Sequence, residues 1–255
     1  MRLFRARKRS LIGLIGANAP GGSRSEGNEW KLVISFVAIR EPDSSAAERN
    51  VHCAMTVSHK DLRRHMDRLK PYQVIEVEVD DDSDPHRIII TKIKRIGLKD
   101  KALLAIAEKL RESVIFDGGE LGEFVLDRRI GCYTGNVEWQ NRTIKLRLES
   151  SHAEEPVKAM EWAKILLNAE DTWNARIGAF VIEKMLDMKN GEWRDDDETE
   201  ITGPEFLKRM VPTSLELTEE GSFTFWFDDG ELFFGHSIMV DGHLESGLRN
   251  ASLFG

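Results

Sequence analysis

Alternating apolar and polar residues predict a small mixed unit in residues 30–98. Leu62, Met66 and Leu69 recur at helical spacing, and Pro71 ends this predicted helix. Two strand-like segments precede the helix and two follow it, each rich in β-branched residues or alternating with charged ones. These four segments are residues 30–39, 51–57, 75–79 and 87–96. We therefore predict a β-β-α-β-β unit.

Residues 99–120 are predicted to hold a helix that links this unit to the rest of the chain. Asp100 is a good helix-capping residue. After it, Leu103, Ala107 and Leu110 keep a spacing of three and four residues, which is typical of an amphipathic helix. We interpret this helix as the connector between two domains.

Residues 121–255 are predicted to form an antiparallel sheet with long helices packed on one face. Strand-like alternation runs through residues 124–148, and apolar residues then recur at helical spacing over residues 157–189, as one helix or two in tandem. Thr202 and Glu205 form the capping box of a further short helix. Together with the N-terminal β-β-α-β-β unit, this pattern predicts an α+β fold.

The most informative segment is the aromatic run of residues 222–238. Asp229 and Gly230 suit a two-residue turn that needs positive φ, so we predict a tight hairpin with Phe227 opposite Leu232. Side chains alternate between the faces of a strand, which sorts the hairpin into two sets. The predicted core set is Phe223, Phe225, Phe227, Leu232, Phe234 and His236, with Phe223 opposite His236.

The other face of this hairpin combines two aromatic rings with two carboxylates. It is either a cover for the helices or an exposed recognition patch. The candidate binding residues on this face are Trp226, Phe233, Asp228 and Glu231.

The string GSFTFWFDDGELFFGHSI at residues 221–238 resembles the signature of the bacterial family catalogued as domain of unknown function 2262. FVLDRRIG at residues 124–131 and VEW at residues 137–139 look like the opening strands of that family. The resemblance covers about residues 121–255. It implies a cytoplasmic bacterial protein of α+β type with no established activity, so it assigns no functional residues.

The composition of the chain excludes several classes of protein and of cysteine-based site. The 255 residues are 41% hydrophobic and 31% charged, which excludes collagen-like, mucin-like and wholly disordered chains. Two cysteines, Cys53 and Cys132, are too few for a disulfide framework, an iron–sulfur site or a paired-cysteine zinc site, and they indicate a reducing cytoplasm.

The net charge of −8 is distributed unevenly along the chain. Residues 1–29 carry six basic and two acidic side chains (+4), and residues 30–98 carry twelve and eleven (+1). Residues 99–255 carry 18 and 31 (−13). Because an acidic surface repels phosphates, we expect no nucleic-acid binding by the main domain.

Residues 1–29 are predicted to be a disordered basic tail. Five of the first nine residues are Arg or Lys, and the apolar run of residues 11–16 follows. This run is shorter than the roughly 7–15 residues of a secretory signal and the about 20 that span a bilayer. Contact with a membrane surface or an anionic polymer, and a signal or misassigned start, are the alternatives. We expect deletion of the tail to leave thermal stability unchanged.

The sequence contains no phosphate-binding glycine loop, dinucleotide fingerprint, zincin helix or nucleophile elbow, so we expect no cofactor and no metal. His236 is the best candidate for chemistry, because imidazole titrates near neutral pH. Asp228 and Asp241 are weak catalytic candidates beside it. The alternative interpretation of His236 is a hydrogen-bonded core residue. Cys132 has no base near it in the sequence.

We predict a cytoplasmic bacterial protein without a membrane span, most simply a non-catalytic protein-interaction module with an acidic, aromatic face. A basic protein is its natural partner. The competing hypothesis is a small-molecule hydrolase or metal-dependent enzyme with a site around His236. A pocket that unites His236 with two carboxylates would favour the enzyme, whereas helices that cover Trp226 and Phe233 would remove the exposed patch.

Overall fold

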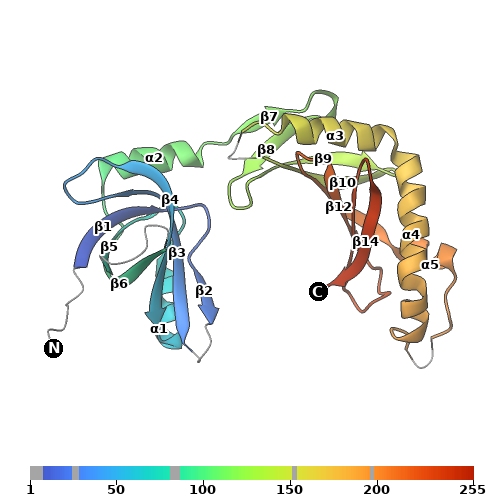
Figure 1. Cartoon of the computed structure of the whole chain (residues 1–255), viewed down its shortest axis with the longest axis horizontal. Helices are drawn as coiled ribbons and strands as arrows, with labels where there is room; N and C mark the ends of the chain where they lie inside the picture. The colour runs from blue at the N-terminus through green and yellow to red at the C-terminus, as the bar shows by residue number, and fades with distance from the viewer. Residues whose placement is uncertain (1–7, 25–28, 81–86, 151–153, 196–197) are drawn as a thin grey trace. The chain divides into compact units, whose positions relative to one another are not determined.

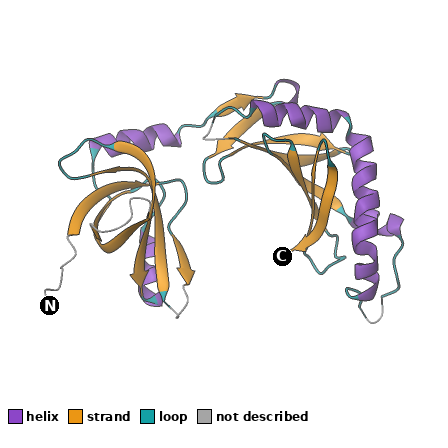
Figure 2. Cartoon of the chain, in the orientation of Figure 1, coloured by secondary structure: helices purple, strands orange, loops and turns teal. Residues whose placement is uncertain are grey.

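The computed structural model describes residues 8–24, 29–80, 87–150, 154–195 and 198–255. The chain forms two compact units, Met1–Glu112 and Ser113–Gly255. Helices and sheets are both present in each unit, which confirms the predicted α+β class (Figure 2). Within the described residues, no helix is both long and apolar enough to cross a membrane.

The first unit is built around a closed barrel (Figure 1). β1 pairs antiparallel with both β5 and β3, β3 pairs antiparallel with β4, β4 runs parallel to β6, and β6 pairs antiparallel with β5. A five-stranded barrel of this kind has the architecture of an OB-fold. The strands are β1 (Lys8–Ile15), β2 (Gly21–Arg24), β3 (Trp30–Arg40), β4 (Ala47–Val57), β5 (Val74–Asp80) and β6 (Arg87–Ile96).

Strand β1 corrects the prediction of a disordered tail over residues 1–29. Leu11 and Ile15 are buried in the barrel interior, whereas Ile12 and Leu14 are buried in the cluster that helix α2 (Lys101–Arg111) completes. An apolar run without alternation is therefore a strand covered on both faces. The other residues of this segment that the structure describes include β2, which pairs with β3. Residues 1–7 and 25–28 lie outside the described residues.

The elements β3, β4, α1 (His59–Arg68), β5 and β6 follow one another in the order that the sequence predicts for residues 30–98. Ser58 caps α1 by accepting a hydrogen bond from the Asp61 backbone, and Leu62 is its buried residue. Leu69, just after the helix, is also fully buried, whereas Met66, the third residue of the predicted apolar spacing, is exposed.

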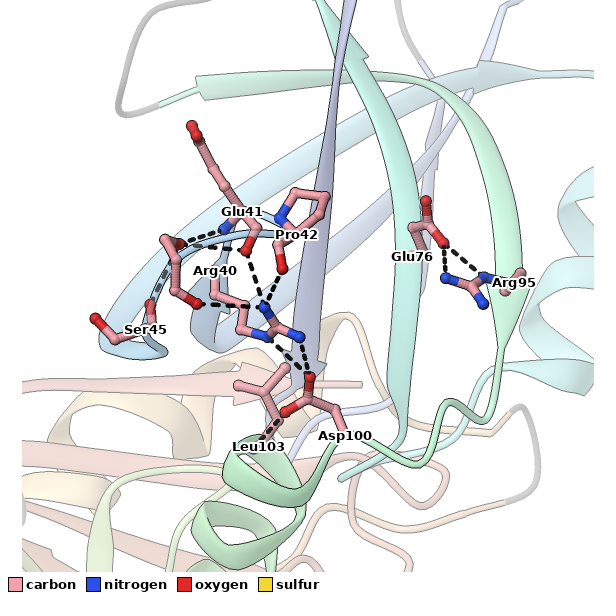
Figure 3. Close-up of polar contacts among 9 residues, drawn as sticks. Arg40, Glu41, Pro42, Ser45, Glu76, Arg95, Asp100 and Leu103 are labelled. Carbon is pink, nitrogen blue, oxygen red and sulfur yellow. Dashed lines mark hydrogen bonds and ion pairs between the residues drawn. The ribbon is translucent and has the colours of Figure 1, made fainter.

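Helix α2 (Lys101–Arg111) packs on the first unit, although the sequence suggested a connector. Asp100 caps it by accepting a hydrogen bond from the Leu103 backbone nitrogen at 3.0 Å. Arg40 at the end of β3 contacts the same carboxylate at 2.6 Å (Figure 3). Leu103 and Ala107 are fully buried against the outside of β1. The helix therefore belongs to the barrel unit.

The second unit is one sheet whose eight strands follow each other in chain order. All neighbouring pairs are antiparallel except β10 and β11, which run parallel and so correct the predicted antiparallel sheet. Parallel neighbours need a long crossover, and the helices lie between these two strands. The strands are β7 (Ile115–Asp117), β8 (Glu123–Asp127), β9 (Cys132–Trp139), β10 (Arg142–Glu149), β11 (Val211–Leu217), β12 (Ser222–Asp228), β13 (Ser237–His243) and β14 (Gly247–Phe254).

The helices of the second unit line one side of its sheet (Figure 1). They share one apolar core with the strands, which include fully buried Trp139 and Phe225, 4.7 Å apart between ring centroids. The predicted helical stretch is two helices in tandem, separated at Ala169. The helices are η1 (Gly119–Leu121), α3 (Val157–Asn168), α4 (Glu170–Gly191) and α5 (Gly203–Arg209).

Candidate functional site

The aromatic hairpin has a longer loop than the sequence predicts. β12 pairs with β13, so that Phe227 lies opposite Ile238 and Phe223 opposite Gly242. Residues 229–236 therefore form a loop, and the predicted pairs of Phe227 with Leu232 and of Phe223 with His236 are wrong. The core assignment of Phe223, Phe225 and Phe227 is confirmed, since all three are buried.

A buried carboxylate explains the loop. Asp229 is 2% exposed, and its side chain accepts hydrogen bonds from the backbone nitrogens of Phe233 at 2.6 Å and of Gly235 and Glu231 at 3.2 Å. Short acidic side chains compete for backbone donors in this way, which folds the chain back before it can extend into a strand. Glu231 and Phe234 both adopt positive φ, at 66° and 55°. This left-handed conformation is strained for residues other than glycine.

The four predicted binding residues do not share one face. Phe233 is fully buried, with its ring 5.6 Å from that of Trp193 and 5.9 Å from that of Phe206. Trp226 is half-buried on β12, edge-to-face with Phe254. Only Asp228 and Glu231 are exposed. The predicted patch of Trp226 and Phe233 is therefore not formed.

Phe234, and not Phe233, is the exposed aromatic ring of this loop. It is 55% exposed, although the predicted alternation placed it in the core. Its neighbours Asp195, Glu198, Glu231 and Arg209 line an open hollow of about 390 Å³ with it. We call these five residues the Phe234 site. It retains an acidic and aromatic character, with Glu231 as the member that the sequence prediction and the structure share.

Trp193 supports the aromatic side of the site. Its ring centroid lies 5.6 Å from those of both Phe233 and Phe234 and 5.1 Å from that of His236. One indole thus packs against three side chains of the loop. Trp193 lies far from the loop in sequence and outside any periodic pattern, so sequence reasoning missed it.

A buried lysine lies beneath the carboxylates of the Phe234 site. Lys189 is 1% exposed at the end of α4, and its ammonium donates to the Glu198 carboxylate at 2.5 Å and to the Trp193 carbonyl at 2.7 Å. Arg209 at the end of α5 contacts Glu198 at 3.5 Å and donates to the carbonyl of Gly230 at 2.9 Å. Glu198 therefore joins the ends of two helices, and Arg209 links them to the loop.

This contact predicts an acid-sensitive step. The hydrogen bond from Lys189 lowers the pKa of Glu198 in the folded state. The group therefore contributes stability above its unfolded pKa, near 4.3, and that contribution is lost as the pH falls through the folded pKa. We expect the melting-temperature difference between wild type and Glu198→Gln to be constant from neutral pH to about pH 5 and to shrink at lower pH.

The measurement is thermal melting followed by circular dichroism at a series of pH values. Glu183→Gln, on an exposed part of α4 beside Lys184, is the matched control and should show no such pH dependence. A difference between wild type and Glu198→Gln that stays constant down to pH 3 would contradict the assignment.

The weak catalytic candidates are not brought into one cleft by any described contact. The Nδ1 of His236 donates to the Phe233 carbonyl at 2.5 Å. Asp228 accepts from the Gly230 backbone, and Asp241 pairs with Arg249 at 3.6 Å. Among the described residues, no group of three or more His, Cys, Asp or Glu side chains is placed to hold a metal ion.

Cys132 lines a hollow of about 420 Å³ together with Arg147, Glu149 and Glu216. Burial, together with the carboxylates of Glu149 and Glu216, raises the pKa of the Cys132 thiol. A nucleophilic cysteine needs the opposite shift, because the thiolate is the reactive form. The environment of Cys132 therefore keeps its thiol protonated.

Comparison with known families identifies the second unit. A family model described as "Uncharacterized protein conserved in bacteria (DUF2262)" matches residues 119–253. The chain belongs to this family. The match includes the loop of residues 229–236 and both helices that carry Lys189 and Arg209, so the whole Phe234 site lies within the DUF2262 region.

The first unit also matches a family model. Residues 2–110 match a model described as "Domain of unknown function (DUF7021)". No curated protein matches the chain. A solved structure of the mitochondrial single-stranded DNA binding protein Rim1 from S. cerevisiae is 15% identical, with a TM-score of 0.29, and the match covers 36% of this chain and 94% of that one.

Proposed function

We propose that the DUF2262 unit is a protein-interaction module that binds a basic segment of a partner protein at the Phe234 site. The observation that carries the proposal is an exposed aromatic ring held at positive φ among carboxylates. Backbone strain of this kind costs about 1–3 kcal/mol and clusters at functional positions. Phe234 is exposed at that cost, while the next residue toward the N-terminus, Phe233, fills the core.

Charge complementarity selects the partner. Residues 113–255 carry 14 basic and 28 acidic side chains, a net charge of −14. Glu231 and Asp195 are the carboxylates beside Phe234 that the buried Lys189 does not contact. A Lys or Arg side chain can pair with these carboxylates and also lie over the aromatic ring, while an apolar neighbour packs on Phe234.

A synthetic peptide of Lys, Arg and Leu, labelled with fluorescein, tests this proposal through its anisotropy. We expect Phe234→Ala to weaken binding by about 30-fold, the loss of an aromatic anchor worth roughly 2 kcal/mol. Glu231→Lys should weaken it similarly. Glu183→Lys makes the same charge change on exposed α4 and is the matched control, with a small expected effect.

Three outcomes count against the proposal. The first is the absence of binding by the basic peptide. The second is equal binding of a peptide in which Glu replaces Lys and Arg. The third is an equal loss in Glu183→Lys and Glu231→Lys, which would mean that the overall charge of the unit, and not the Phe234 site, attracts the peptide.

We also propose a cytoplasmic location. Cys53 and Cys132 are both free thiols, and they lie in different units. Free thiols are typical of reducing compartments. This supports the cytoplasm as the place where the module meets its partner.

A second candidate function concerns the first unit, which we propose binds a nucleic acid. Residues 1–112 carry 22 basic and 16 acidic side chains, a net charge of +6, because this unit includes the basic residues 1–29. The acidic excess that argues against nucleic acid is confined to the other unit. Barrels of OB architecture offer strand faces and loops suited to oligonucleotides.

A further inference from the structure

We infer that the first unit binds single-stranded nucleic acid at one end of its barrel, where Arg24, Trp30, His59, Lys60 and Arg63 come together. We call these residues the rim patch. The inference rests on the second proposed function. It adds the location of the site on the barrel, the preference for a single strand over a duplex, and base stacking as the mode of binding. The patch lies where β2 ends, β3 begins and α1 starts (Figure 1).

Three flat side chains form the centre of the rim patch. The rings of Trp30 and His59 lie 5.0 Å apart between centroids, at an interplanar angle of 36°. The Arg24 guanidinium lies 5.8 Å from the Trp30 centroid. His59 and Arg24 are exposed, while Trp30 is half-buried between strand and helix. The indole therefore contacts two flat groups that belong to exposed residues.

Positive charge lies beside this stack on α1. Lys60 and Arg63 are exposed on the first turns of that helix. Asp61 is the acidic residue of that helical turn. Its carboxylate already accepts hydrogen bonds from the Ser58 hydroxyl at 2.8 Å and from Arg64 at 2.7 Å. Among the described residues, no ion pair joins Lys60 or Arg63 to a carboxylate, so both cations can contact phosphates.

The combination selects a single strand. Bases stack on aromatic rings and guanidinium planes only when their faces are open, and a duplex hides those faces. Phosphates of the same strand can meet Lys60 and Arg63 on α1 beside the stack. Stacking does not read base edges, so we expect little sequence preference.

The test is fluorescence anisotropy of the full chain with a labelled oligothymidine of about 20 nucleotides, longer than the ~4–16 that one OB barrel covers. We expect measurable binding that weakens with salt, and weaker binding of a duplex of equal length. His59→Ala and Arg24→Gln should each weaken binding about fivefold or more, as expected when a stacking surface is lost. Lys60→Gln with Arg63→Gln should reduce the salt slope by about 1–2.

Lys101→Gln with Lys109→Gln is the matched control, since it removes two exposed charges from α2 of the same unit. Trp30 also packs against the barrel core, so Trp30→Phe, which keeps a ring, is used beside Trp30→Leu, and both are melted to check folding. We expect Trp30→Phe to retain most of the affinity that Trp30→Leu loses.

The outcomes separate the two proposals. If neither DNA nor RNA oligonucleotides bind, the second proposed function and this inference both fail. If oligonucleotides bind but the rim variants behave like the α2 control, the barrel binds nucleic acid elsewhere and the rim patch is wrong. Equal or tighter duplex binding would contradict the stacking mode.

Discussion

Deletion of residues 1–15 is expected to unfold the first unit. These residues include β1, which pairs with β5 on one side and β3 on the other and so closes the barrel. The deletion opens both ladders and removes four buried aliphatic side chains, each worth about 1.5–3 kcal/mol. That sum approaches the whole stability of a domain, about 5–15 kcal/mol. The buried residues are Leu11, Ile12, Leu14 and Ile15.

Thermal melting followed by circular dichroism, with limited proteolysis of the products, measures this result. The second unit has its own core, so we expect a protease-resistant fragment that begins near Ser113. Deletion of residues 1–7, which leaves β1 intact, is the control and should keep both units folded. Unchanged melting after the longer deletion would restore the earlier expectation of a dispensable tail.

The contrast between β1 and β5 shows what the sequence could predict in the first unit. β5 alternates Ile75, Val77 and Val79 with charged residues, because one of its faces is solvated, and that alternation predicts a strand. β1 is covered on one face by the barrel interior and on the other by α2. Its unbroken apolar run has no period, so sequence alone could not distinguish it from a short signal-like segment.

In the second unit, the sequence correctly predicts the features that depend on the local pattern of a single element. The capping box of Thr202 and Glu205 is present, and the apolar helical positions face the core. The hairpin prediction failed because Asp-Gly indicates a tight turn, whereas the Asp229 carboxylate instead satisfies backbone donors up to six residues further on. Turn prediction depends on the residue types at the turn positions, and it does not show which carboxylate becomes buried.

The candidate site was predictable only in part, for a related reason. Glu231 could be named because it lies within the aromatic run itself. Lys189 and Trp193 reach the site from the end of a helix about 40 residues earlier, and that proximity depends on the tertiary fold. A buried lysine near the end of an otherwise apolar helix face is the one signal that could have pointed to a partner carboxylate.

Asp229→Ala should destabilise the second unit far more than Asp228→Ala, although the two carboxylates are adjacent. Removal of Asp229 leaves three backbone nitrogens without their acceptor, and charged hydrogen bonds contribute about 1.5–3 kcal/mol each, with partial overlap. We expect a loss of about 3–5 kcal/mol for Asp229→Ala. Asp228 is exposed and accepts one such bond, from Gly230, so its loss should stay below about 1 kcal/mol.

Variants at Asp229 separate the effect of its hydrogen bonds on the loop conformation from the effect of its negative charge. Asp229→Asn keeps an acceptor oxygen in a side chain of the same size, so we expect it to recover part of the stability. Because Asp229 holds Phe234 at its exposed position, basic-peptide affinity should fall in Asp229→Ala at temperatures where the unit is still folded. Denaturant unfolding gives the free energies, and anisotropy gives the affinities. Equal losses in Asp228→Ala and Asp229→Ala would show that the buried carboxylate does not organise the loop, and Phe234 would then lose the constraint on which its proposed binding role depends.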